Sequence, residues 1–128
     1  MDVYEMIEQL GVDLEYTLDL PPYRLGEYLD DERKIRIRAN LTHTFEEEAL
    51  YHEYAHALYR DRSCDPRLEH RALREAARLI IDPEAYARAE IVNPNPLAIA
   101  RELDVTLHMI EVYQRAVIHG SIRLLEIA

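Results

Sequence analysis

The sequence lacks several features that mark particular classes of protein. It has a single cysteine, Cys64, so no disulfide can form within the chain, which suits the reducing cytoplasm. No apolar run approaches the roughly 20 residues of a membrane span, and the acidic start MDVYEMIEQL is unlike a signal peptide. Lys and Arg number 15 against 25 Asp and Glu, and the resulting net charge of −10 disfavours nonspecific binding to DNA or anionic membranes. We therefore expect a cytoplasmic protein with no membrane partner.

The remaining composition is that of a globular domain. The chain has 128 residues, of which 48% are hydrophobic and 31% are charged. It contains no internal repeat, low-complexity tract or long linker, so we expect one domain over residues 1–128.

Residues 1–42 are predicted to contain a helix and a β-hairpin. Apolar residues recur at helical spacing over 3–10. Residues 23–29 and 34–39 are predicted to be the two strands of the hairpin, because the second strand alternates between an apolar and a basic face. With the helices described next, this predicts an α+β fold that is mostly helical and has a small antiparallel sheet.

Residues 43–82 are predicted to form a helix pair. Thr44 and Glu47 match a capping box, which would start a helix that runs to about Tyr59. Asp65 is a good N-cap and Pro66 suits the first helical position, so a second helix is expected to run to about residue 81, where Pro83 should stop it. Two further helices are predicted in the C-terminal region 97–128, over residues 97–103 and 107–117.

The first helix of the pair carries the pattern H-E-x-x-H at His52, Glu53 and His56. Each helical residue turns by about 100°, so the two histidines project from one side a turn apart, with Glu53 beside them. In such a pattern two imidazoles bind zinc and the glutamate acts as a general base. The apolar stripe of the same helix lies roughly opposite and consists of Leu50, Tyr54, Ala57 and Leu58. We therefore expect the histidines to line a groove.

The second helix of the pair places a carboxylate, Glu69, in the middle of its apolar face. On a helical wheel its neighbours within about 60° are Ala72, Leu73, Ala76 and Ile80. Burying an unpaired carboxylate is costly, so Glu69 is expected to face a cation or a metal. Glu75 serves as a contrast, since it is expected on the solvated face in a pair with Arg71 or Arg78.

Together the two helices predict a catalytic metal site. Packing them against each other would bring Glu69 to the face that carries His52 and His56. Two imidazoles, one carboxylate and an open fourth position are typical of catalytic zinc, whereas structural zinc has four protein ligands. Zn²⁺ is the expected cofactor, with another divalent ion such as Mn²⁺ as the alternative.

The block IRIRANLTHTFEEEALYHEYAHALYRDRSCDPRLEHRALREAARLII resembles the central part of the ImmA/IrrE-type metallopeptidases, small cytosolic zincin-like proteins. The matching positions of the two helices are His52, Glu53, His56, Ala57, Pro66, Glu69, Ala72, Ala76, Ala77 and Ile80. The resemblance implies a zincin-like fold, a metal bound by His52, His56 and Glu69, and Glu53 as the catalytic base. Where the family often has a polar residue that can orient a ligand, this chain has Leu73.

The resemblance also implies a substrate, because these proteins are often encoded beside a phage or mobile-element repressor. The expected function is therefore zinc-dependent cleavage of a helix-turn-helix transcriptional repressor. The oxyanion of the reaction needs a donor, and Tyr113, His108 and His119 are candidates that the sequence does not separate.

Two other functions remain open from the sequence. A metal-binding adaptor could hold the repressor without cutting it, which the apolar Leu73 favours. Residues 97–114 also have the residue pattern of a helix-turn-helix, with its turn at 104–106. Direct DNA binding is disfavoured, because Glu111 on the second of these helices would repel phosphates.

Overall fold

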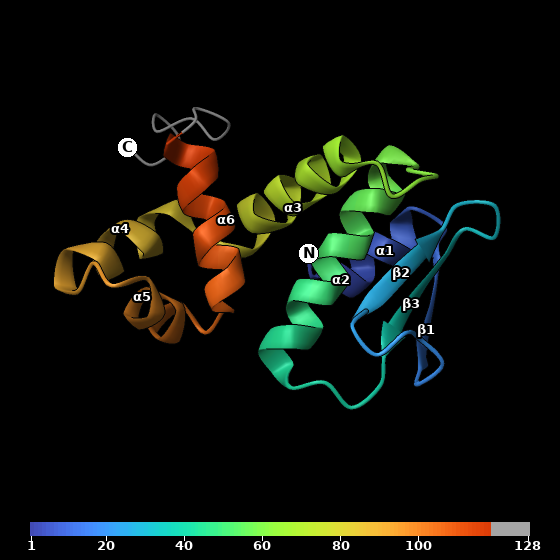
Figure 1. Ribbon diagram of the computed structural model, residues 1–128, viewed down its shortest axis with the longest axis horizontal. Coiled ribbons are helices and arrows are strands. Elements are labelled where there is room, and N and C mark those ends of the chain that lie inside the picture. Colours follow the sequence, from blue (N-terminus) through green and yellow to red (C-terminus); the bar gives the residue numbers. More distant parts are fainter. Residues whose placement is uncertain (119–128) are drawn as a thin grey trace.

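Helix α2 (His43–Tyr59) lies in the middle of the protein, between a small sheet and the other long helices (Figure 1). The computed structural model describes residues 1–118, which form an α+β fold as the sequence predicts. Two hydrophobic clusters flank α2. One joins α1 (Val3–Gln9), the sheet and α2, and the other joins the helices from α3 onward. Tyr51 of α2 packs against both clusters and so connects them.

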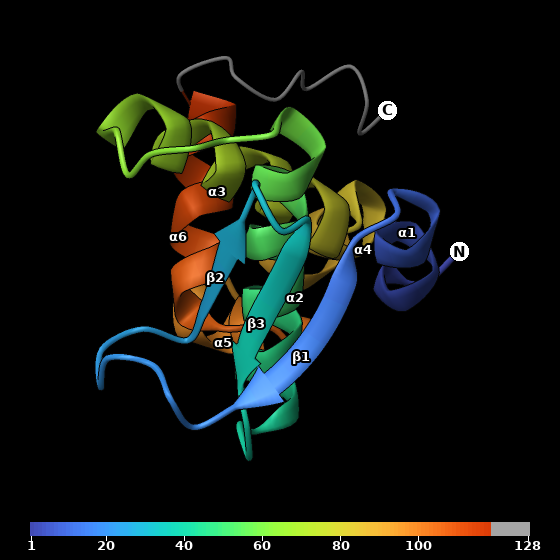
Figure 2. The same ribbon diagram turned by 90° about the vertical axis from the view of Figure 1, so that its right-hand side faces the viewer.

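The sheet has three strands in the order β1–β3–β2, with α2 behind it (Figure 2). The predicted hairpin is confirmed as β2 (Gly26–Leu29) and β3 (Lys34–Arg38), which pair antiparallel. The prediction of a purely antiparallel sheet is wrong, because β1 (Asp13–Thr17) adds to β3 in parallel. Strand β1 was missed because it is an edge strand with largely exposed side chains, so its sequence DLEYT has almost no buried alternation.

Strand β3 has the two faces that its alternation predicts. Ile35 and Ile37 are fully buried and belong to the cluster that contains α2. Arg36 lies on the other face and forms ion pairs with Glu15 on β1 and Glu27 on β2. The outer face of the sheet is thus held by cross-strand charge pairs, and its inner face by burial against α2.

Four helices follow α2: α3 (Pro66–Ile80), α4 (Pro83–Val92), α5 (Pro96–Leu103) and α6 (Leu107–Ile118). The predicted N-cap of α3 is confirmed, since the Asp65 carboxylate accepts from the amide of Arg67. The predicted helices near 97–103 and 107–117 are confirmed as α5 and α6. Helix α4 was missed, because Pro83 was interpreted only as the stop of α3, although Asp82 caps α4 just as Asp65 caps α3.

Two details of α2 differ from the prediction. The helix begins at His43, with Thr42 as an extended N-cap whose side chain makes no capping bond. Thr44 therefore lies inside the first turn, where its backbone is helical and its hydroxyl cannot act as the N-cap. Leu58, predicted to belong to the apolar stripe, is exposed, whereas Leu50, Tyr54 and Ala57 are buried as expected.

No helix within residues 1–118 combines the length and the apolar character that crossing a bilayer requires.

Gly26 at the start of β2 leaves no room for a side chain. A Cβ there would lie 2.9 Å from Ile37 Cδ1, 3.1 Å from the Arg36 carbonyl oxygen and 3.1 Å from Glu53 Cγ. We expect Gly26→Ala to lower the free energy of unfolding by about 1–3 kcal/mol, since the strand must move away from the backbone of β3. Urea unfolding followed by circular dichroism measures this.

Gly11 provides the comparison for that substitution. A Cβ at Gly11 meets no atom within 4 Å, but its φ of +72° favours glycine, so Gly11→Ala should cost about 1 kcal/mol through the backbone alone. Only Gly26→Ala should also disturb Glu53. An unfolding free energy of Gly26→Ala equal to that of the parent would show that β2 is not packed as described.

Candidate metal centre

The end of α2 and the start of α3 bring the predicted ligands together. His52 and His56 lie one turn apart on α2, and Glu69 lies in the first turn of α3. Between the helices Arg60 adopts a left-handed conformation (φ 54°), and the amide of Asp61 bonds back to the carbonyl of His56. This reversal ends α2 and allows α3 to fold back against it.

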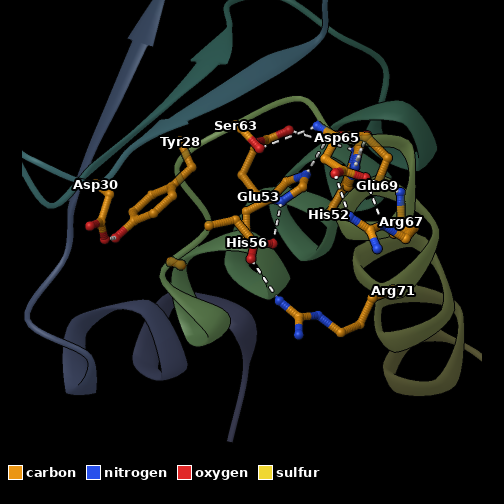
Figure 3. Close-up of polar contacts among 12 residues, drawn as sticks. Tyr28, Asp30, His52, Glu53, His56, Ser63, Asp65, Arg67, Glu69 and Arg71 are labelled. Atoms are coloured by element: carbon orange, nitrogen blue, oxygen red, sulfur yellow. Dashed lines mark hydrogen bonds and ion pairs between the residues drawn. The ribbon is translucent and has the colours of Figure 1, made fainter.

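Glu69 bridges the two imidazoles (Figure 3). Its Oε2 lies 3.1 Å from Nε2 of His52, and its Oε1 lies 2.9 Å from Nε2 of His56. Each of the three residues can offer one ligand atom such that these atoms lie within 4.8 Å of one another. The structure therefore places His52, His56 and Glu69 in one group that could hold a metal ion.

The donor set suits a zinc ion. Zn–N and Zn–O bonds of about 2.0–2.2 Å in a tetrahedron place neighbouring ligand atoms about 3.3 Å apart. The two nitrogen–oxygen separations here, 2.9 and 3.1 Å, differ from that value by a few tenths of an ångström. Two imidazoles and a carboxylate leave a fourth position for water or substrate, which is the composition of a catalytic site.

Asp61 orients one of these ligands. Its Oδ2 lies 2.9 Å from Nδ1 of His56, and its Oδ1 accepts from Nη2 of Arg71 at 2.7 Å. A carboxylate on Nδ1 keeps the proton there and leaves the lone pair of Nε2 for a metal. The guanidinium of Arg71 also lies 4.0 Å from the ring centre of Tyr59. The sequence pattern gave no sign of Asp61, which follows directly after the helix end, and it predicted Arg71 on the solvated face.

Glu53 lies beside the ligand group without belonging to it (Figure 3). Only 5% of the residue is exposed, and its Oε2 is 3.6 Å from Nδ1 of His52, beyond hydrogen-bond distance. Burial raises the pKa of Glu53, although the two histidines partly oppose this. A carboxylate whose pKa is raised holds a proton more readily, which suits it to accept and release one.

The ligand group itself is polarised by its contacts. The hydrogen bond from His52 lowers the pKa of Glu69 to about 2, although partial burial opposes it. Burial disfavours the charged form of His52, yet the Glu69 hydrogen bond and the nearby carboxylates outweigh it and raise the His52 pKa. The contact between His52 and Glu69 thus favours a protonated imidazole beside an ionised carboxylate.

The prediction that Glu69 is buried on the apolar face of α3 is wrong. The Glu69 side chain is 38% exposed, whereas the side chain of Glu75, predicted to be solvated, is only 16% exposed. Glu75 is paired with Arg78 as predicted. Glu69 faces the open side of α3 beside α2, so its position is explained by the two histidines and not by an apolar surrounding.

A cavity of ≈ 650 Å³ opens over this group. Helix α2 contributes Glu48, Ala49, His52, Glu53 and His56, and residues 23–29 of the β2 region line another side. The α2–α3 loop, Glu69 and Leu73 of α3, and His108 of α6 complete it. A second cavity of equal volume lies between α4 and α5, but it is not bordered by any residue of the metal-binding group.

The candidate oxyanion donors Tyr113 and His108 differ in their access to the cavity. Tyr113 is 1% exposed and packs against Tyr86 with 4.9 Å between ring centres, so it belongs to the hydrophobic core. His108 lines the cavity. His119 lies outside the described residues. Cys64 is exposed at the cavity rim and His70 is exposed on α3, and neither is part of the ligand group.

Comparisons with protein-family models, with curated proteins and with solved structures found no significant match to this chain.

The ligand group predicts the metal content of the protein. The purified protein should carry about one divalent ion per chain, and His52→Ala and His56→Ala should each lose it, because two protein ligands hold zinc poorly. Elemental analysis of gel-filtered protein measures this. His70→Ala removes an exposed histidine of α3 and should retain the ion. Equal metal content in all three variants would place the ion elsewhere.

The Asp61 contact predicts a graded effect on affinity. Asp61→Asn keeps the size of the side chain but weakens the hold on Nδ1 of His56, so zinc affinity should fall about 10- to 100-fold. Competition with a chromophoric chelator measures the dissociation constant. Asp31→Asn is the control, since Asp31 is exposed and pairs with Arg62. If Asp61→Asn and Asp31→Asn bind zinc equally well, Asp61 does not tune the site.

Proposed function

We propose that this protein is a zinc-dependent endopeptidase of the zincin type, related to the ImmA/IrrE metallopeptidases. One observation carries the proposal: Nε2 of His52 and Nε2 of His56 converge on Glu69 at the base of a cavity, with the buried carboxylate of Glu53 beside them. Structural sites are closed by four protein ligands, whereas this one offers three.

The residues divide between metal binding and proton transfer. An ion held by His52, His56 and Glu69 would polarise the scissile carbonyl and make a water beside it more acidic. Glu53 would take the proton from that water on its carboxylate and deliver it to the leaving nitrogen. The raised pKa of Glu53 supports this role, because the group must both accept and release the proton near neutral pH.

Strand β2 supports a peptide substrate. It lies at an edge of the sheet, pairs with β3 on one side, and lines the cavity. An extended peptide can add to such an edge through main-chain hydrogen bonds, which would carry its backbone past the histidines. By the family resemblance, we propose that the peptide belongs to a helix-turn-helix repressor of a phage or mobile element.

Direct DNA binding is a weaker proposal. Helices α5 and α6 are joined by a turn at Asp104, as in a helix-turn-helix. However, α6 contributes much of the second core, through Met109, Ile110, Val112, Tyr113 and Ala116. Its exposed residues include Glu111, which would repel phosphates.

A non-catalytic adaptor is the main alternative. Leu73 favours it, since this apolar side chain lines the cavity where the family often has a polar residue. Asp61 weakens that argument, because it provides His56 with an orienting carboxylate from the α2–α3 loop. Glu53 separates the two functions experimentally.

Glu53→Gln should bind zinc and fold like the parent but fail to cleave peptides. The amide keeps the size of the side chain but cannot accept the proton, so the rate should fall by at least 10²-fold. A quenched-fluorescent peptide library measures cleavage in vitro, and coexpression with any helix-turn-helix repressor that is encoded beside the gene measures it in cells. His56→Ala should lose both metal and cleavage.

The control for Glu53→Gln is Glu75→Gln, which removes another little-exposed glutamate, one that pairs with Arg78 and does not line the cavity. This variant should cleave at nearly the parental rate. If Glu53→Gln relieves repression as well as the parent does, proteolysis by this centre is not the function, and the adaptor alternative holds.

A further inference from the structure

His108 is held by a carboxylate from α2 at the border of the cavity. It lies in the first turn of α6, and its Nδ1 is 3.1 Å from Oε2 of Glu48. The hydroxyl of Thr106 donates to the other oxygen of Glu48 and accepts from the amide of Met109 at 3.1 Å. Both oxygens of Glu48 are therefore engaged, and the imidazole is tied through them to α2.

This contact places His108 close to the candidate metal centre. Glu48 and His52 are four residues apart on α2, so they lie on the same side of the helix about 6 Å apart along its axis. Glu48, His52 and His108 all line the same cavity. Within residues 1–118, Nε2 of His108 makes no hydrogen bond, and the side chain is 49% exposed.

The surroundings of His108 favour the imidazolium, in which both ring nitrogens donate. The hydrogen bond with Glu48 raises the pKa of His108. Partial burial and the positive charges of Arg115 on α6 and His52 on α2 act in the opposite direction without cancelling that effect. In this imidazolium Nδ1 donates to Glu48 while Nε2 also carries a proton, which it can offer to a ligand.

We propose that His108 is a catalytic residue that donates a hydrogen bond from Nε2 to the substrate carbonyl oxygen as that oxygen becomes negatively charged. The proton stays on the imidazole, and Glu48 acts as a positioning residue. This inference rests on the proposed peptidase function and assigns a role that the ligand group and Glu53 leave unfilled. Among the described candidates, Tyr113 is buried in the core, so only His108 reaches the cavity.

The experiment compares the zinc-loaded full chain with His108→Ala. Removing one oxyanion donor should reduce kcat about 10²- to 10³-fold while KM changes less than about threefold. A second readout uses an acetylated dialanine phosphinate, whose tetrahedral PO₂⁻ group replaces the scissile amide. His108→Ala should bind this probe at least about tenfold more weakly by calorimetry, because tetrahedral anions gain most from such donors. Zinc content should not change.

His43→Ala is the matched control, since His43, the first residue of α2, is also a histidine paired with a glutamate, Glu47, but lies outside the cavity. It should match the parent in every readout. Glu48→Ala should lower kcat with little change in KM, and Glu48→Gln, whose amide oxygen can still accept from Nδ1, should restore part of the loss. If His108→Ala keeps kcat within threefold of the parent, or binds the phosphinate equally well, the proposal is wrong.

The phosphinate also separates this proposal from the proposed function. If the parent cleaves no peptide of the library, the peptidase proposal fails, and probe affinity alone decides the role of His108. Tighter binding by the parent than by His108→Ala then still supports a donor for tetrahedral anions. A parent that neither cleaves peptides nor binds the phosphinate overturns both proposals.

Discussion

The convergence of His52 and His56 on the Glu69 carboxylate is the interaction on which the rest of the site depends. Each imidazole places Nε2 about 3 Å from a different oxygen of Glu69. Without a cation, such an arrangement is held by a proton, which is why the pKa of His52 is raised while that of Glu69 is lowered. A divalent ion would take the place of that proton. Metal uptake and proton release are therefore coupled at this point of the fold.

The convergence is built by the way α2 ends. The left-handed Arg60 reverses the chain, which puts Asp61 beside His56 and directs α3 back along α2. Arg71 of α3 then binds Asp61, so the two helices are joined through the same carboxylate that orients a ligand. A change in the helix pairing would move Asp61 and Glu69 together. The orientation of His56 and the packing of α3 against α2 therefore depend on the same carboxylate, that of Asp61.

The sequence predicted that His52, His56 and Glu69 lie together, but it did not predict every element around them. His52, Glu53 and His56 follow from helical spacing, and the Asp65–Pro66 start of α3 follows from capping chemistry. By the same capping rule Asp82 and Pro83 begin α4, although Pro83 was interpreted only as the end of α3. Strand β1 and Asp61 gave no such local signal, because their roles depend on partners far along the chain or beyond a helix end. Tertiary contacts decide such positions.

The burial of Glu53 bears on the choice between an enzyme and an adaptor. Glu69 is partly exposed, whereas Glu53, which lies 3.6 Å from Nδ1 of His52 without a hydrogen bond, is almost fully buried. Burying a carboxylate that has no hydrogen-bonded cation costs stability, and a Cβ at Gly26 would lie only 3.1 Å from its Cγ. An adaptor that needed only metal and shape would gain from an apolar residue at position 53. The buried acid beside two imidazoles therefore supports the proposed proton transfer over the adaptor alternative.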